Sequence, residues 1–273
     1  MLVSFKKLQA SFENLNLISI RFVHGFRFKF SICKTYVLQK FSAQYVVPSN
    51  YSWVLPYLKD KRKLDFFIEV GSRDALDAIF LSQFFKAQGV AFECVPENVL
   101  GCLNNIRISG ESRLSIDERC LAELSGEVTF NAIDTDKHDN PGAGSLLELD
   151  FSTRDEMNPD RNLGIIQRTI RVKAVRFDET NYAIPHSVFM DVQGAELLVL
   201  KGFGSRITKV TNVVLETSLV STYKTGATFW EVYDFLEASG FRYIISNRFG
   251  TDLPPVDLPE IFDGEFDVLF SRH

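Results

Sequence analysis

Cysteine is scarce in this sequence, and its spacing excludes a disulfide framework. The 273 residues contain four cysteines, Cys33, Cys94, Cys102 and Cys120, and no C-x-x-C pair. Small secreted domains depend on dense, paired cysteines, and structural zinc sites use closely spaced ones. We therefore expect reduced thiols in a cytoplasmic protein, and we assign no residue to a metal.

Long apolar runs are also missing. A membrane helix needs about 18 or more consecutive apolar residues, and no segment reaches that length without a charge. The first residues lack the clean apolar block of a signal peptide, and internal repeats are absent. The sequence is thus typical of a soluble, intracellular protein without a transmembrane segment.

The net charge is small, at −5, because two opposite charges nearly cancel. Residues 1–63 carry eleven Lys or Arg against two acids, a net +9, and the remaining residues carry −14. A basic arm on an acidic body could contact phosphates or anionic lipid. We favour the simpler alternative, a solvated basic edge packed on an acidic neighbour.

Residues 1–62 are expected to form a separate N-terminal extension. Residues 26–32 alternate strictly, with three phenylalanines and Ile32 on one face and basic residues on the other. Together with residues 20–22 and a His24-Gly25 turn, they predict a β-hairpin. Two prolines and a charged run follow, so we place the end of this hairpin and helical extension near residue 62. Its phenylalanine face is a candidate homodimer contact.

In residues 63–273, predicted strands and helices alternate. "DFFIEVG" at 65–71 predicts a strand, and "ALDAIFLSQFF" at 75–85 predicts a helix capped by Ser72 or Asp74. "VAFECV" at 90–95 predicts a second strand, and a helix begins at Pro96. The expected apolar stripes are Leu76, Ile79, Phe80 and Phe84 in the first helix, and Val99, Leu103 and Ile106 in the second. Successive strand–helix units require a parallel sheet covered on both faces.

The rest of the domain continues this pattern. "SVFMDV" at 187–192 and "NVVLETS" at 212–218 predict strands, and Thr228 with Glu231 forms a capping box for a helix that Gly240 ends. "FRYIIS" and "EFDVLFS" predict a terminal antiparallel hairpin, whereas residues 114–177 resemble an insertion or edge hairpin. We therefore predict an α/β fold with a mostly parallel, doubly wound sheet.

Two acids stand at the ends of neighbouring predicted strands. Glu69 and Glu93 are 24 residues apart, and each lies at the end of a strand in successive strand–helix units. In open parallel sheets, ligands bind beyond the carboxyl ends of the strands. A carboxylate that ends the second strand is the usual acceptor for ribose hydroxyls, so Glu93 favours a cofactor that contains a nucleoside. The alternative is a strand-end glutamate that is merely solvated.

The turn after the first predicted strand has too few glycines for a dinucleotide. A pyrophosphate needs the three glycines of G-x-G-x-x-G, whereas "GSRDAL" supplies Gly71 and then Ser72, Arg73 and Asp74. The acid at Glu69 would also repel phosphates and suits a cationic or amino-bearing ligand. The sequence argues against NAD and FAD.

Several segments resemble the FkbM family of class I S-adenosylmethionine-dependent methyltransferases. They follow the family's order over about residues 64–245 and include "FIEVGSRDALDAIFLSQ", "AFECVPENVLGCLNNI", "GEVTFNAI", "NPGAGSL", "VKAVRFDE" and "FLEASGF". The most specific string is "DVQGAE" at 191–196, followed by a Leu-Lys-Gly sequence that ends at Gly202.

The resemblance implies a Rossmann-like, seven-stranded sheet whose last strand is antiparallel, and S-adenosylmethionine as the cofactor. It implies the methionine end of the cofactor near Glu69, Gly71, Ser72, Arg73 and Asp74, the ribose on Glu93 beside Cys94, and the adenine near Asp117 and Cys120. The sequence departs from the family's usual motifs: Glu69 and Ser72-Arg73 replace Asp and Ala-Asn, Cys94-Val95 replaces Pro-Asn, and Gln193 replaces Glu.

The acids that follow later strands are candidates for the chemistry. Asp191 is the first candidate for a general base and Glu216 the second, because a base assists transfer to a hydroxyl. As substrate contacts we predict Gln193, Glu196, His138 and Tyr223. For Glu196 capping of the next helix is an equal alternative, and for His138 and Tyr223 the alternative is an ordinary loop.

The leading function is O-methylation of a hydroxyl on a sugar, glycan or related small molecule, as the resemblance implies. Methylation of nucleic acid is an alternative prompted by the basic arm, but the body is acidic, so we expect no nucleic-acid partner. A non-catalytic binding or scaffold protein is the third alternative, prompted by the altered first motif.

Overall fold

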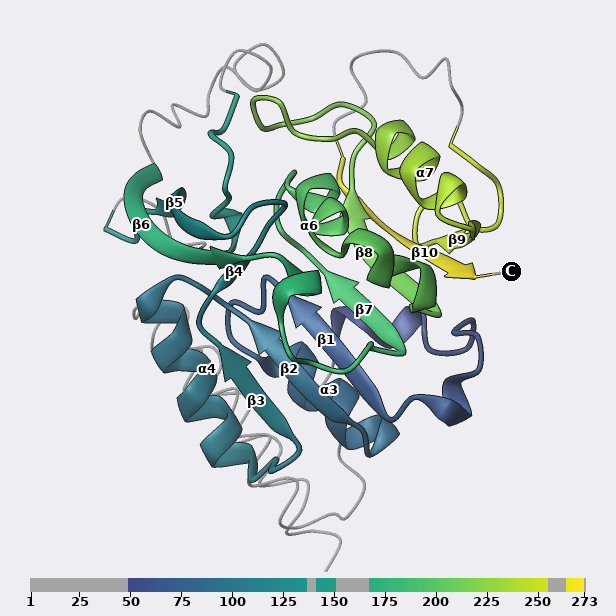
Figure 1. Ribbon diagram of the computed structural model, residues 1–273, viewed down its shortest axis with the longest axis horizontal. Coiled ribbons are helices and arrows are strands. Elements are labelled where there is room, and N and C mark those ends of the chain that lie inside the picture. Colours follow the sequence, from purple (N-terminus) through teal and green to yellow (C-terminus); the bar gives the residue numbers. More distant parts are fainter. Residues whose placement is uncertain (1–48, 137–140, 151–166, 255–263, 273) are drawn as a thin grey trace, which may run out of the picture. The chain divides into compact units, whose positions relative to one another are not determined.

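A seven-stranded sheet forms the centre of the protein (Figure 1). The computed structural model describes residues 49–136, 141–150, 167–254 and 264–272. Strands β1, β2, β3, β7 and β8 are parallel, and β10 is antiparallel to both of its neighbours, β8 and β9. Across the sheet the order is β3 (Leu114–Asp117), β2 (Gln88–Phe92), β1 (Phe66–Val70), β7 (Ser187–Met190), β8 (Asn212–Thr217), β10 (Phe266–Arg272) and β9 (Phe241–Ser246). This order confirms the predicted Rossmann-like α/β fold and its terminal antiparallel hairpin.

Apolar side chains alternate between the two faces of the sheet, and each face has its own cover. Phe67 and Phe189 pack with α3 (Leu76–Phe85) and with residues 51–58, which overlap η1 (Asn50–Trp53). Their neighbours Ile68 and Val188 point to the opposite face, where α6 (Glu196–Gly202) and α7 (Phe229–Ala238) pack. Two separate cores result, because successive side chains of a strand point to opposite faces.

The expected helical stripes were wrong at one residue in each of the first two helices. Phe84 is 49% exposed, while Ala78, Leu81 and Ser82 of α3 are buried. This helix is enclosed on most sides, so a one-sided stripe does not describe it. In α4 (Pro96–Ser109), Leu103 is 46% exposed, because the helix turns Val99, Cys102 and Asn105 inward.

The boundaries of α4 and α7 follow the predicted capping chemistry. Pro96 occupies the first turn of α4, where its missing N–H costs no helical hydrogen bond. Thr228 and Glu231 form the predicted capping box of α7, with the Glu231 carboxylate accepting from the Thr228 backbone N–H at 2.8 Å. Gly240 follows α7 with a φ of 86°.

A second, three-stranded sheet lies beyond the carboxyl ends of β1 and β2 (Figure 1). It has the order β4 (Cys120–Leu121), β6 (Gln167–Val175) and β5 (Gly126–Ile133), and β5 and β6 pair antiparallel. The predicted insertion or edge hairpin at residues 114–177 thus corresponds to this small sheet, except that its first residues form β3 of the main sheet. The short 3-10 helices are η2 (Lys61–Lys63), η3 (Pro141–Ala143), η4 (Phe177–Glu179) and η5 (Gly204–Lys209).

The predicted N-terminal hairpin lies outside the described residues and stays a prediction. The chain divides into two units between Val46 and Val47. Within the second unit, Tyr51, Val54 and Leu58 belong to the core that covers one face of the sheet. Among the described residues, no helix has the length and apolarity needed to cross a membrane.

Candidate functional site

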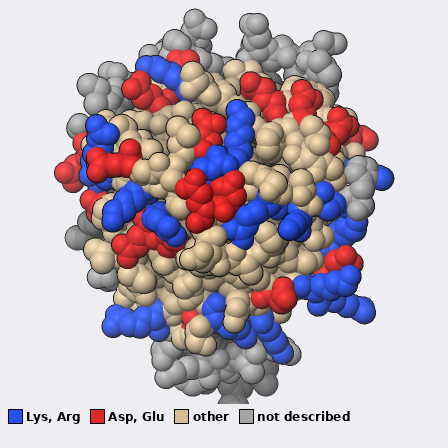
Figure 2. Space-filling view, viewed as in Figure 1, with Lys and Arg blue, Asp and Glu red and all other residues tan. Residues whose placement is uncertain are grey.

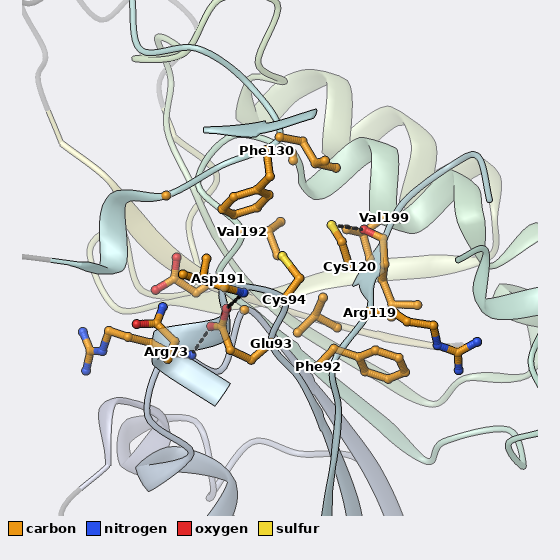
Figure 3. Close-up of a pocket in the computed structure, with 18 of the residues that line it drawn as sticks. Arg73, Phe92, Glu93, Cys94, Arg119, Cys120, Phe130, Asp191, Val192 and Val199 are labelled. Carbon is orange, nitrogen blue, oxygen red and sulfur yellow. Dashed lines mark hydrogen bonds between the residues drawn. The ribbon is translucent and has the colours of Figure 1, made fainter. Parts of the chain in front are cut away.

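Two adjoining cavities open at the carboxyl ends of β1, β2 and β7. The first, of about 50 Å³, lies between these strand ends and the small sheet, and Figure 3 shows its lining. The second, of about 410 Å³, lies on the side of β8 and η1. Gly71, Arg73, Gly142 and Asp191 line both cavities. The strand ends thus border one continuous candidate site, at the edge of the sheet where open α/β proteins bind ligands.

The turn after β1 passes too close to β7 for any side chain at residue 71. Gly71 has a φ of 82°, and a Cβ built on it would lie 1.9 Å from the carbonyl oxygen of Asp191. The backbone N–H groups of Gly71 and Ser72 both donate to the carbonyl of Phe92, at 3.0 and 3.1 Å. The single glycine therefore fixes the junction of three strand ends.

Glu93 holds the loop after β1 against the end of β2. Its carboxylate accepts hydrogen bonds from the backbone N–H groups of Arg73 and Val95, each at 2.8 Å. Burial raises the pKa of Glu93, and these backbone donors oppose the rise. Figure 3 shows the carboxylate inside the first cavity, while the guanidinium of Arg73 points away from it. Each oxygen keeps a lone pair, so the carboxylate can accept further hydrogen bonds from a ligand.

Glu69 borders the second cavity. It is buried and accepts a hydrogen bond from the hydroxyl of Ser72. Burial raises its pKa well above the usual value, and the nearby Asp77 carboxylate raises it further. Glu69 forms no ion pair with a residue that the structure describes, and only the more distant Arg73 charge favours its ionised form. A positively charged group in this cavity would therefore relieve the cost of its burial.

The inner end of the first cavity is apolar. Phe130 of β5 and Val199 of α6 line it together with the thiols of Cys94 and Cys120 (Figure 3). Both cysteines are free thiols, and the hydrogen bond with the Cys120 thiol, followed by burial, raises the pKa of Cys94. A flat, weakly polar group suits this end better than an ionic one.

Asp191 and Glu216 are joined through one amide group. Gln193 Nε2 donates to Asp191 Oδ1 at 2.8 Å and to Glu216 Oε2 at 2.7 Å. The hydroxyl of Tyr223 donates to Gln193 Oε1 at 2.8 Å and so fixes which end of the amide faces the acids. Burial and the adjacent Asp191 carboxylate raise the pKa of Glu216 to about 10, and burial also raises that of Asp191.

The Glu216→Gln variant should lose less stability than the wild type as the pH rises. An acid with a raised pKa in the folded state contributes stability that is complete below its unfolded pKa, near 4.3, and is lost as the pH rises toward its folded pKa, about 10. Glutamine stays neutral and keeps an oxygen for Gln193. Urea unfolding measures this difference. Between pH 5 and pH 9, the free energy of unfolding should fall by at least about 1 kcal/mol more in the wild type than in Glu216→Gln.

A control for this measurement is Glu237→Gln, which changes an exposed acid on α7. It should follow the wild type across the pH range. If Glu216→Gln also followed the wild type, the raised pKa of Glu216 would be contradicted.

The structure brings most of the predicted cofactor and base residues together. Those that line the two cavities are Glu69, Gly71, Ser72, Arg73, Glu93, Cys94, Cys120, Asp191 and Glu216. Asp74, just before α3, instead accepts from the Leu76 N–H at 3.0 Å. The N-cap of α3 is Ala75, without a side-chain cap hydrogen bond, so the predicted cap at Ser72 or Asp74 was wrong. Asp117 is bonded by Arg119 and Tyr182 and does not line either cavity.

The predicted substrate contacts fall elsewhere. Gln193, Glu196 and Tyr223 line a separate small hollow beside Thr217. Oε1 of Glu196 accepts from the backbone N–H groups of Val192 and Gly194, in the loop before α6. The N-cap of α6 is Ala195 and makes no side-chain cap hydrogen bond, so Glu196 holds this loop and does not cap the helix. His138 lies outside the described residues.

Sequence reasoning missed one wall of each cavity. Tyr51, Trp53, Asn247 and Asp267 line the second cavity and belong to none of the family motifs quoted above. Asp77 also lines it and lies within one of those motifs, but was not predicted as a site residue. In the first cavity, Phe130 and the Gly142–Gly144 turn were missed as lining residues, although the glycine-rich string "NPGAGSL" was a signal that this segment lies at a site. Within the described parts of the chain, no group of three or more His, Cys, Asp or Glu residues is arranged to hold a metal ion.

Comparison with known proteins identifies a family. The model of the Methyltransferase FkbM domain matches residues 70–243. No curated protein matches the sequence.

Solved structures with a similar fold include three methyltransferases. Methyltransferase FkbM from Methylobacillus flagellatus KT has a TM-score of 0.46 at 12% identity, covering 75% of this chain and 43% of that one. TrmK of M. capricolum, in complex with S-adenosyl-homocysteine, has a TM-score of 0.43 at 9% identity, covering 84% and 70%. Precorrin-6y C5,15-methyltransferase from Geobacter metallireducens GS-15 has a TM-score of 0.40 at 10% identity, covering 77% and 82%. This chain spans less than half the length of the first of these proteins. The family match extends from the end of β1 into β9, and on that match the chain belongs to the FkbM methyltransferase family.

Proposed function

We propose that the protein is an S-adenosylmethionine-dependent methyltransferase that methylates a hydroxyl on a sugar, glycan or related small molecule. The observation that carries the proposal is the pair of buried acids, Glu69 and Glu93, at the ends of two adjacent parallel strands. They border adjoining cavities in a chain of the FkbM methyltransferase family.

The residues present fit S-adenosylmethionine. Glu93 has lone pairs free for the ribose hydroxyls, and Glu69 offers a carboxylate for the ammonium of the methionine end. Phe130 and the two thiols of the first cavity provide apolar surface for the adenine. The cofactor supplies, when bound, a methyl group already activated by a positively charged sulfur.

Asp191 is placed to act as the general base. It lines both cavities, so it stands between the proposed cofactor site and the space for an acceptor. There Asp191 would take the proton of the acceptor hydroxyl while the cofactor supplied the methyl group. Glu216 is the weaker candidate, because its pKa of about 10 keeps it protonated at neutral pH. Gln193 orients both carboxyl groups through the bonds described above.

The charges favour a small acceptor over a nucleic acid. Figure 2 shows Lys and Arg interspersed with Asp and Glu on the face drawn, with no continuous basic surface there. The second cavity carries several carboxylates at the place where the acceptor would enter. Phosphate-rich acceptors need clustered positive charge near the reacting group.

Isothermal titration calorimetry with S-adenosylmethionine tests the proposal. We expect binding with a dissociation constant at or below about 100 µM, which corresponds to about −5.5 kcal/mol. NAD is the matched control ligand, because it shares the adenosine half but carries a pyrophosphate that this turn does not accommodate. No heat with S-adenosylmethionine up to millimolar concentration would favour the non-catalytic scaffold instead.

A further inference from the structure

The second cavity has more room than the methionine end of a cofactor requires. Its volume of about 410 Å³ lies in the range of small-molecule sites. Glu69 and Asp191 stand on the side next to the proposed cofactor site. Tyr51 and Trp53 of η1 and Asp267 of β10 also line it, and none of them lines the first cavity. These residues are available to contact an acceptor.

The lining of this cavity is strongly acidic. Its described residues include five carboxyl groups and one guanidinium; the acids are Glu69, Asp77, Asp191, Glu216 and Asp267. The guanidinium of Arg73 is already bonded to Asp74, at 3.0 and 3.2 Å. Burial, followed by the Asp191 carboxylate, raises the pKa of Asp267 to about 6. An anionic occupant would add repulsion to an already crowded set of acids, whereas a cation would relieve it.

The cofactor can satisfy only part of this charge. Its ammonium and sulfonium are positive and its carboxylate is negative, so it brings a net charge of about +1 to a site with several acids. Glu69 and Asp191 are the nearest partners for these positive groups. Asp77 lines the second cavity but is already bonded by Ser49 and Asn50. Asp267 accepts one side-chain hydrogen bond, from Asn247 Nδ2 at 2.8 Å, and keeps lone pairs for another ligand.

Tyr51 provides a second, independent indication of a ligand. The residue is 5% exposed, and its ring packs on Phe189 with a centroid distance of 5.0 Å. Its hydroxyl makes no hydrogen bond to any residue that the structure describes, although the residue lines the cavity. Burial raises the pKa of Tyr51, and four of the cavity's acids raise it further. The hydrogen-bonding capacity of this hydroxyl is therefore not used by the described residues, and a ligand group in the cavity can bind it.

We propose that the acceptor carries a cationic amine beside the hydroxyl that is methylated, and that Tyr51 and Asp267 bind this ammonium group. An ammonium donates three hydrogen bonds, which the Tyr51 oxygen and the cavity's carboxylates accept. The inference rests on the proposed function and narrows its substrate to amino sugars and other amino alcohols. Neutral sugars and sugar phosphates are disfavoured.

Matched pairs of probes test this inference on the full chain saturated with S-adenosylhomocysteine. The pairs are D-glucosamine with D-glucose, and 2-aminoethanol with 1,2-ethanediol, so the outcome does not depend on a sugar ring. Competition or direct calorimetry should show that the amine of at least one pair binds at least about tenfold more tightly than its neutral partner. Equal affinities in both pairs, or no measurable binding of either amine, would overturn the inference.

Two variants test whether Tyr51 and Asp267 cause the preference for the amine. Tyr51→Phe keeps the ring on Phe189 and removes the hydroxyl, and Asp267→Asn removes one charge; each should reduce the preference for the amine to about threefold or less. Tyr57→Phe is the matched control, because Tyr57 is 48% exposed and does not line the cavity. An unchanged preference in both Tyr51→Phe and Asp267→Asn would contradict the assignment.

The same titrations separate the two proposals. If S-adenosylhomocysteine itself does not bind to the wild type, the proposed function fails and the inference fails with it. If it binds with the same affinity to wild type and Tyr51→Phe while amines show no preference, the inference alone is overturned.

Discussion

Replacing Gly71 with alanine is expected to destabilise the protein and to abolish cofactor binding. The new Cβ would lie 1.9 Å from the Asp191 carbonyl oxygen, closer than any real contact, and the backbone φ of 82° disfavours a side chain. The carbonyl belongs to the backbone, so it can move only by displacing the end of β7. Overpacking of this kind typically costs about 1–3 kcal/mol, in addition to about 1 kcal/mol for the left-handed conformation.

A matched control separates the clash from the backbone conformation. Gly110 also has a positive φ, of 68°, but a Cβ there would meet no atom within 4 Å. Urea unfolding should therefore show a loss for Gly71→Ala that exceeds the loss for Gly110→Ala by at least about 1 kcal/mol. Gly110→Ala should bind S-adenosylmethionine normally. Equal losses in the two variants would contradict the close approach of β1 and β7.

Glu93→Gln is expected to weaken the binding of S-adenosylmethionine by at least about tenfold, which is about 1.4 kcal/mol. The substitution keeps the size of the side chain but removes its charge, and it replaces one accepting oxygen with an N–H donor. That donor would face the backbone N–H of Arg73 or of Val95, or a ribose hydroxyl. The variant therefore disturbs the loop after β1 and the proposed ribose contact together.

Glu97→Gln is the control for this change. Glu97 lies four residues after Glu93, in the first turn of α4. Its side chain is 64% exposed and pairs with Arg168 at the surface. Exposed pairs contribute about 0–1 kcal/mol, so cofactor affinity should stay within about threefold of the wild type. A Glu93→Gln protein that bound the cofactor as tightly as Glu97→Gln would remove the ribose assignment.

The order of strands and helices in the main domain was predictable because local chemistry sets their boundaries. Pro96 at the start of α4 and the Thr228–Glu231 capping box of α7 both depend on residues within one turn. The predictions that Phe84 and Leu103 belong to the buried stripes were wrong, because burial depends on what packs around the helix. The sheet, residues 51–58 and α4 enclose α3, and Asn105 of α4 turns inward to donate to the Asp74 carbonyl at 2.8 Å.

The site was predictable where a residue follows directly from a strand end. Glu69, Glu93, Asp191 and Glu216 each lie at or just after the end of a parallel strand, so the sheet alone brings them to the same edge. Asp117 also ends a strand, but Arg119 two residues later bonds its carboxylate and directs it away from the cavities.

Contacts that depend on tertiary packing left no sequence signal. Tyr223 was predicted as a substrate contact, but its bond to Gln193, 30 residues away, was not, because it depends on the loop after β8 folding back over the loop after β7. Tyr51 precedes the region matched by the family model and enters the site because η1 packs on Phe189. No periodicity or motif spacing encodes such contacts.

A crystal structure of the complex with S-adenosylhomocysteine tests the central claim most directly, since that claim assigns one carboxylate to the sugar and another to the amino-acid end. It should show both ribose hydroxyls within hydrogen-bonding distance of the Glu93 oxygens and the amino group on the side of Glu69. A bound product whose ribose lies away from Glu93, or that occupies neither cavity, would contradict the account.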